Sequence, residues 1–190
     1  MSIRIPEGVS GRMYEAETLG SGVAATKWFA RARELGADEQ GFLPYEKAVE
    51  LAREFQPSDP TNPAMDFPND LRLAIIERLE ERGLLEPNNE DNVKFYSAVG
   101  MPLDIFHGVD AFVEVVGNNG DIYRVTLDET TNPKKLAEGY KANLVFAPPP
   151  DAVQNQDAYL AEVDQLADDA MEFFARDMKR AASGAQRQAA

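Results

Sequence analysis

Two strand-like segments in the middle of the chain each carry a carboxylate where a buried strand normally carries an apolar side chain. They span residues 109–116 and 121–130, and the turn Gly117-Asn118-Asn119-Gly120 between them is typical of a β-hairpin. Burying an ionised carboxylate costs free energy unless a cation or hydrogen-bond donors meet it, so Asp110 and Asp128 on neighbouring strands indicate a shared partner. A divalent metal ion is the natural candidate, because hard cations bind carboxylate oxygens.

Alternation along the strands decides which of these side chains can meet. Successive side chains point to opposite faces, so Asp110 shares a face with Glu114, and Asp128 shares one with Thr130. If the two faces coincide, Asp110 and Asp128 can hold Mg²⁺ or Mn²⁺ with water, with Glu114 as a third candidate ligand. Metal-assisted hydrolysis of a phosphodiester requires such a site.

The composition limits the class of protein and of metal site. A chain of 190 residues can bury one substantial core, and the lack of cysteine excludes disulfides and thiolate zinc sites. His107 is the only histidine, which excludes a multi-histidine metal site. The net charge of −14 weighs against a broad nucleic-acid surface, so any such site must be local. The acidity fits ordinary solubility, an acidic or saline habitat, or mimicry of a nucleic acid toward a basic partner.

Hydrophobic periodicity predicts an α+β fold: a small mixed central sheet of about four strands flanked by helices, with a helical N-terminal region and a long C-terminal amphipathic helix. Helices are expected from about Gly22 to Gly36, from Pro44 or Tyr45 to Phe55, from Asn69 or Asp70 to Gly83, and from Asp157 to Ala182. A loop is expected at Pro57, Pro60, Pro63 and Pro68. Strands are expected at residues 93–99, 109–116, 121–130 and 141–147.

This pattern divides the chain into three parts. Residues 1–68 are expected to form a helical extension packed on the core, residues 69–182 an α/β core that ends in the long helix, and residues 183–190 a disordered tail. The first residues lack the apolar run of a signal peptide, and no segment has the apolar length of a membrane span. We therefore expect a cytoplasmic protein without a membrane partner.

The central block resembles the PD-(D/E)XK nuclease superfamily over about residues 70–147. The resemblance rests on Gly108-Val109-Asp110 followed by Leu127-Asp128-Glu129-Thr130. It implies a core of helix, mixed sheet and helix, in which an acid opens the second strand and a (D/E)-X-K tripeptide lies on the third. Asp110 takes the place of the first acid and Asp128 that of the acid in the tripeptide, while Thr130 stands where the family has its lysine.

The resemblance also implies where the missing lysine could be. Some members carry it on a neighbouring element, and here Lys135, Lys134 or Lys141 could reach back, with Lys135 as the first choice. The implied catalytic set is then Asp110, Asp128 and Lys135, with Mg²⁺ or Mn²⁺ as the cofactor. Whether a lysine reaches this site separates a working nuclease from an inactive relative.

Each candidate residue also has a structural interpretation. Glu77 can approach the metal, as a helix acid does in some family members, or be surface charge. His107 can contact a phosphate or carry a proton, or be structural. Asp110 can be a solvated residue at a strand start, and Asp128 can belong to a polar strand end before Pro133. In the structural interpretation, Glu114, Lys134 and Lys135 are charged side chains exposed to solvent.

Three hypotheses for function follow. The first is a metal-dependent nuclease that hydrolyses phosphodiester bonds in DNA or RNA. The second is a catalytically inactive nuclease-like or unrelated acidic protein, such as a phage or mobile-element inhibitor, that binds a basic protein. The third is an unrelated α+β domain that assembles through its C-terminal helix, for example as a homodimer. The first two differ in whether Asp110, Asp128 and a lysine amine converge.

Overall fold

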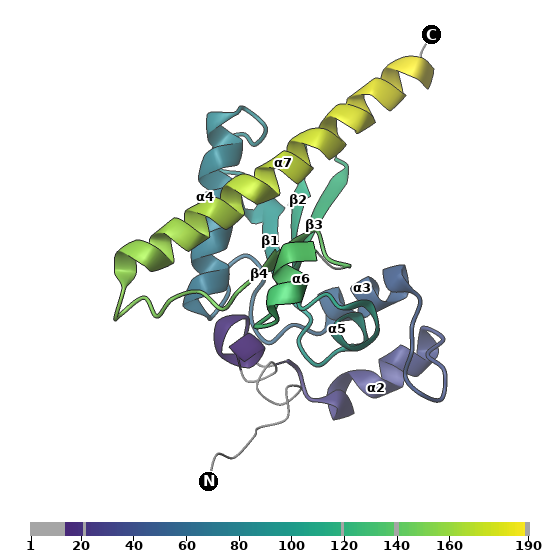
Figure 1. Cartoon of the computed structure of the whole chain (residues 1–190). Helices are drawn as coiled ribbons and strands as arrows, with labels where there is room; N and C mark the ends of the chain where they lie inside the picture. The colour runs from purple at the N-terminus through teal and green to yellow at the C-terminus, as the bar shows by residue number, and fades with distance from the viewer. Residues whose placement is uncertain (1–13, 21, 119, 139–140, 189–190) are drawn as a thin grey trace.

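A four-stranded mixed sheet lies at the centre of the computed structural model, which describes residues 14–20, 22–118, 120–138 and 141–188 (Figure 1). The strands are β1 (Val93–Ser97), β2 (Ala111–Val116), β3 (Ile122–Glu129) and β4 (Leu144–Phe146), in that order across the sheet. Strand β2 is antiparallel to both β1 and β3, whereas β4 runs parallel to β3. The α+β fold with a small mixed sheet is thus confirmed.

The helices include all four that periodicity predicts and several shorter ones. The expected four are α2 (Ala25–Glu34), α3 (Tyr45–Glu54), α4 (Asp66–Glu81) and α7 (Gln156–Gln188). The additional ones are a short N-terminal helix of residues 14–18, the 3₁₀ turn η1 (Glu90–Asn92), α5 (Pro102–His107) and α6 (Pro133–Glu138).

Two helix ends differ from the sequence expectation. Pro68 lies in the first turn of α4, where a missing N–H breaks no helical hydrogen bond, so it belongs to the helix and not to the preceding loop. Helix α7 continues past Ala182 to Gln188. Residues 189 and 190 lie outside the described part of the chain, and the disordered tail stays a prediction.

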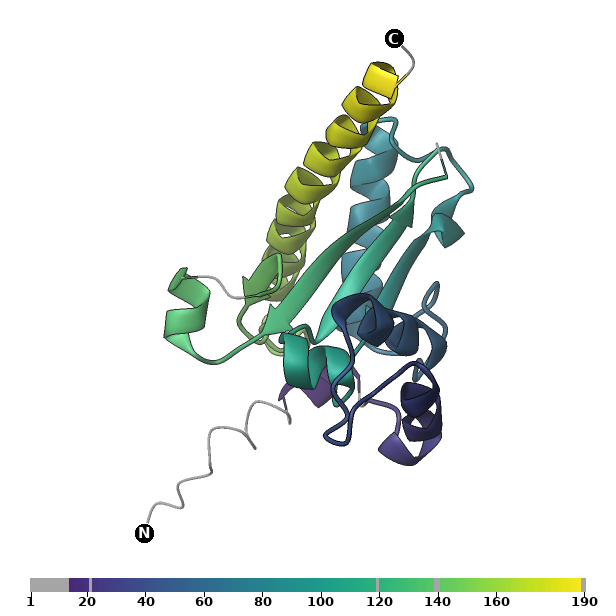
Figure 2. The same cartoon turned by 90° about the vertical axis from the view of Figure 1, so that its right-hand side faces the viewer.

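Helices lie on both sides of the sheet: α4 and α7 run along one face, and α2, α3 and α5 lie near one end of the strands (Figure 2). Helices α4 and α7 pack on the face that carries Phe95, Val113 and Val125. Helices α2, α3 and α5 contribute to the core on the opposite face, around the stacked rings of Tyr96 and Phe112. Within the described residues, no helix is both long enough and apolar enough to cross a lipid bilayer.

Candidate metal site

The two carboxylates of the central hairpin lie opposite each other at one end of the sheet. Ala111 pairs with Leu127 in the β2–β3 register, and Asp110 immediately before it donates its N–H to the Leu127 carbonyl at 2.9 Å. Continuing that register by one residue places Asp110 across from Asp128. Their side chains therefore belong to the same face of the sheet.

Two further acids join Asp110 from elements that the sequence analysis did not predict. Glu15 comes from the short N-terminal helix and Asp104 from α5, and one carboxylate oxygen each of Glu15, Asp104 and Asp110 lies within 4.8 Å of the others. Asp110 is 2% exposed, whereas Glu15 and Asp104 are half-buried. Solvent therefore reaches the cluster from the side of Glu15 and Asp104.

Local structure explains how α5 brings Asp104 to this point. Pro102 occupies the first turn of α5, and Gly108 ends the helix in the left-handed conformation at φ 63°. The Asp104 carboxylate accepts a hydrogen bond from the Gly100 N–H at 2.7 Å. The chain then turns directly into β2, so Asp104 and Asp110 flank this turn.

Burial makes Asp110 a weak acid in the metal-free protein. It raises the pKa of Asp110 to about 9, with the nearby carboxylates of Glu15, Asp104 and Asp128 acting in the same direction. A hydrogen bond from the Glu129 N–H to Asp110 Oδ2, at 2.8 Å, opposes this shift. A cation at the cluster would remove the repulsion and favour the ionised form of Asp110.

Glu129 is a second buried acid next to this cluster. It is 3% exposed, and Thr18 on the short N-terminal helix donates its hydroxyl to Glu129 Oε1 at 3.2 Å. Oε2 has no hydrogen-bond partner among the described residues. Burial raises the pKa of Glu129 to about 7, and the charges of Glu15 and Glu17 add to the shift. The short helix therefore contributes to both the metal cluster and the Glu129 environment.

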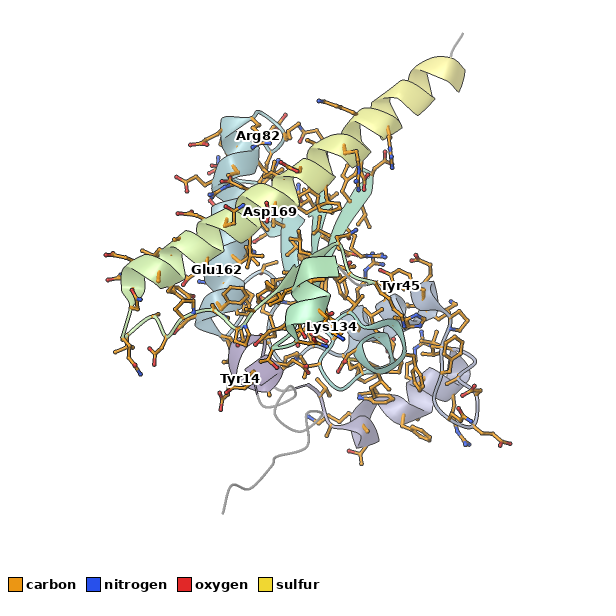
Figure 3. The ribbon with its side chains drawn as sticks, in the orientation of Figure 1. Tyr14, Tyr45, Arg82, Lys134, Glu162 and Asp169 are labelled. Atoms are coloured by element: carbon orange, nitrogen blue, oxygen red, sulfur yellow. The ribbon has the colours of Figure 1, made fainter. Side chains whose placement is uncertain are left out.

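Lys135 reaches the other hairpin acid from α6. Its Nζ lies 3.0 Å from Oδ2 and 3.3 Å from Oδ1 of Asp128, and the Asp128 side chain is 4% exposed. Asn132 caps the start of α6 by accepting a hydrogen bond from the Lys134 N–H at 3.0 Å. Figure 3 labels Lys134 on α6 and Tyr14 on the short N-terminal helix, the two elements that carry Lys135 and Glu15. An acid pair and a lysine amine thus occur at one end of the hairpin.

The remaining predicted residues lie elsewhere or have other partners. Glu114 is 4% exposed and is held by Arg53 Nε at 2.8 Å and Arg124 Nε at 2.7 Å, so two guanidinium groups neutralise it in place of a metal. The interpretation of Glu114 as a solvated surface charge is therefore wrong. His107 Nε2 lies 2.8 Å from the Leu43 carbonyl, and Glu77 is exposed on α4.

The other polar candidates form hydrogen bonds with backbone groups or are exposed. The Thr130 hydroxyl accepts a hydrogen bond from the Asn132 N–H at 3.2 Å, and Lys141 Nζ donates to the Phe106 carbonyl at 3.3 Å. Lys134 is exposed. Lys135 is the candidate lysine for which a contact with Asp128 is observed.

The donor set fits a hard divalent cation. All three groups of the cluster offer carboxylate oxygens, and two ligands of one Mg²⁺ at about 2.1 Å are separated by at most about 4.2 Å. Oxygens within 4.8 Å of one another need only a small side-chain adjustment to reach that spacing. Comparison with protein-family models, curated proteins and solved structures gives no match.

Proposed function

We propose that this protein is a divalent-metal-dependent phosphodiesterase of the nuclease type, acting on DNA or RNA in the cytoplasm. The observation that carries the proposal is the cluster of Glu15, Asp104 and Asp110 beside the Lys135–Asp128 ion pair. Carboxylates that can hold Mg²⁺ or Mn²⁺ next to a cationic amine are the groups that phosphodiester hydrolysis needs.

The order of elements supports a relationship to the PD-(D/E)XK superfamily. Helix α4 is followed by η1 and by three antiparallel strands, with α5 between β1 and β2, and then by α6 and a final strand parallel to β3. Asp110 immediately precedes the second strand and Asp128 lies on the third. In this proposal Lys135, from the element after β3, replaces the family lysine at Thr130.

Each side chain has a proposed role. When bound, the metal ion would polarise the phosphate and lower the pKa of a water molecule. Glu15, Asp104 and Asp110 would hold it, and Asp110 must lose its proton to do so. Asp128 fixes the Lys135 amine, which offsets the charge that develops on the phosphate oxygens.

A cleavage assay tests this function. The protein is incubated with single- and double-stranded DNA and RNA in Mn²⁺, and with a chelator in parallel. We expect metal-dependent cleavage that Asp110→Asn abolishes and that Glu77→Gln leaves unchanged, since Glu77 is an exposed acid on α4. Lack of cleavage on every substrate, or full activity of Asp110→Asn, would contradict the proposal.

A second candidate function is binding of a basic protein, as a phage or mobile-element inhibitor would do. The net charge of −14 favours it, as does an open pocket of about 230 Å³. Glu17, Asp66 and Asp151 line this pocket together with apolar side chains that include Phe67. Such a pocket suits the side chain of a lysine or arginine.

Binding of an oligolysine peptide tests this second function. The parent protein should bind the peptide, and the triple variant Glu17→Gln, Asp66→Asn, Asp151→Asn should not. Equal binding by the parent and the triple variant would contradict this function.

A further inference from the structure

The short N-terminal helix, residues 14–18, supplies Glu15, one of the three carboxylates of the metal cluster. Figure 1 shows this helix in purple, at the end of the molecule away from the C-terminus. Its five residues form little more than one turn, and isolated helices shorter than about 12 residues are marginal in water. The position of Glu15 therefore depends on contacts between this helix and the rest of the fold.

Two consecutive residues dock the helix on the body of the protein. Leu19, directly after the helix, is 2% exposed and belongs to the same core as α4, α7 and the sheet. The Thr18 hydroxyl donates a hydrogen bond to Glu129 Oε1 at 3.2 Å, at the end of β3. Residues three positions apart lie on the same face of a helix, so Thr18 anchors the face that carries Glu15.

Glu129 connects the docked helix to a second ligand of the cluster. Its side chain accepts the hydrogen bond from Thr18, and its N–H donates to Asp110 Oδ2 at 2.8 Å. Glu15 and Asp110 come from separate elements, yet a single residue contacts the element of one and the carboxylate of the other. Partners that hold a metal ligand in place typically change metal affinity 10- to 100-fold.

Charge repulsion opposes this docking in the absence of a cation. Docking brings Glu15 to Asp104 and Asp110, with one carboxylate oxygen of each within 4.8 Å of the others. Burial raises the pKa of Glu129, and the charges of Glu15 and Glu17 raise it further. A divalent cation between the carboxylates would replace this repulsion by attraction.

We propose that residues 14–20 form a strap whose docking and metal binding stabilise each other, with Thr18 and Glu129 as positioning residues. This inference rests on the proposed metal site. Without docking, Asp104 and Asp110 remain as ligands and Glu15 is withdrawn. The factor by which docking raises metal affinity must equal the factor by which saturating metal favours docking. We expect a factor of about ten for both.

Hydrogen exchange of backbone amides, followed by NMR on the full chain with Mg²⁺ or with a chelator, measures docking. The Leu19 amide is the reporter, because it donates to the Glu15 carbonyl at 2.8 Å. Saturating Mg²⁺ should slow its exchange about tenfold. The Arg82 amide is the control and should be unaffected, since Figure 3 shows Arg82 far from Tyr14 on the strap.

Calorimetry with Mg²⁺ measures the other half of the linkage. Glu15→Gln should weaken Mg²⁺ binding by the same factor and abolish the slowing of the Leu19 amide. Mg²⁺ binding to the parent without slower exchange of this amide would overturn the strap and leave the metal site in place. Absence of Mg²⁺ binding to the parent would overturn both.

Threonine variants test the positioning role of the hydroxyl. Thr18→Val keeps the size of the side chain and should weaken Mg²⁺ binding by up to about tenfold, whereas Thr18→Ser keeps the hydroxyl and should bind close to the parent. Thr61→Val is the matched control, because the Thr61 hydroxyl donates to Asp59 Oδ1 in the loop before α4. Equal Mg²⁺ affinity of Thr18→Val and Thr61→Val, or equal losses in Thr18→Val and Thr18→Ser, would overturn the role of Thr18.

Discussion

The amine of Lys135 lies 3.0 Å from Asp128 Oδ2, although the two residues are seven positions apart in sequence and the start of a helix lies between them. In sequence, Thr130 is the residue two places after Asp128, where a strand would direct a side chain to the same face. Helix α6 returns the chain toward β3 and supplies the positive charge from another direction. A lysine on α6 can therefore serve the end of the hairpin without occupying the strand.

Lys135 should matter for catalysis and its neighbour should not. Lys135→Ala removes the charge next to Asp128 and should lower Mn²⁺-dependent cleavage by about 100-fold or more, the usual effect of losing a group that stabilises transition-state charge. Lys134→Ala, which alters an exposed lysine in the same helix, should stay close to the parent. Initial cleavage rates measure both. Equal rates for the two variants would remove Lys135 from the proposed site.

The metal-free protein should lose stability as the pH rises from about 5 to 9. The pKa values of Asp110 and Glu129 are raised to about 9 and about 7, above their values near 4 in the unfolded chain. Between these limits the folded state holds protons that the unfolded state has released. Each group then lowers the free energy of unfolding by up to about 1.4 kcal/mol per pH unit, Glu129 up to about pH 7 and Asp110 up to about pH 9.

Urea unfolding at intervals of pH measures this dependence. Asp110→Asn mimics the protonated acid, so its stability should change little between pH 7 and 9, where the parent still loses stability. A parent protein whose stability rises over this range would show that Asp110 is ionised in the folded state.

Gly22 should not tolerate a side chain. A Cβ at this position would lie 1.7 Å from the Val99 carbonyl oxygen, a clash with backbone that no rotamer change can relieve. Gly22→Ala should therefore cost about 3 kcal/mol or more of unfolding free energy. Gly41→Ala is the comparison, because a Cβ at Gly41 would meet nothing within 4 Å. Its only expected cost is about 1 kcal/mol of unfolding free energy, since a residue with a Cβ disfavours the φ of +87° at this position. Thermal melts compare the two variants. Equal losses of stability would contradict the close approach of Gly22 to the Val99 carbonyl.

Docking of α7 should depend on Phe174 more than on Phe173. Phe174 is 1% exposed in the core between α7 and the sheet, so Phe174→Ala should cost about 3 to 5 kcal/mol. Phe173 is half-buried, and its ring lies under the Arg176 guanidinium at 4.7 Å. Denaturant unfolding should therefore show a clearly smaller loss for Phe173→Ala, and a reversed order would mean that another face of α7 meets the sheet.

Strong periodicity made the larger elements predictable from sequence. The Asn-Gly turn and the alternation of residues 109–116 and 121–130 predict the hairpin, and the observed register places Asp110 opposite Asp128. Helices α2, α3, α4 and α7 each present an apolar stripe long enough to recognise.

The short elements were missed because they carry too few residues for a period. Helices α5 and α6 have six residues each, and neither helix is predicted from the sequence. Asn132-Pro133 is a recognisable signal for the start of α6, with Asn as the cap and Pro at the first position. Because α5 and the short N-terminal helix were not predicted, Asp104 and Glu15 were not among the predicted metal ligands.

Long-range partners account for the remaining difference at Glu114. Parity along β2 correctly groups it with Asp110, but parity does not reveal what approaches the strand from outside. Arg53 comes from α3 and Arg124 from the neighbouring strand, and only the packed structure brings both to one carboxylate.

Calorimetric titration with Mn²⁺ tests the central claim most directly, because it measures the metal site without requiring a substrate. The parent protein should bind Mn²⁺ with an affinity that rises with pH toward about 9, since binding displaces the proton of Asp110. Asp110→Asn should lose this binding, whereas the exposed-acid control Glu77→Gln should match the parent. Mn²⁺ binding to Asp110→Asn that equals binding to the parent, or no binding to the folded parent at any pH up to 9, would contradict a metal site at this end of the sheet.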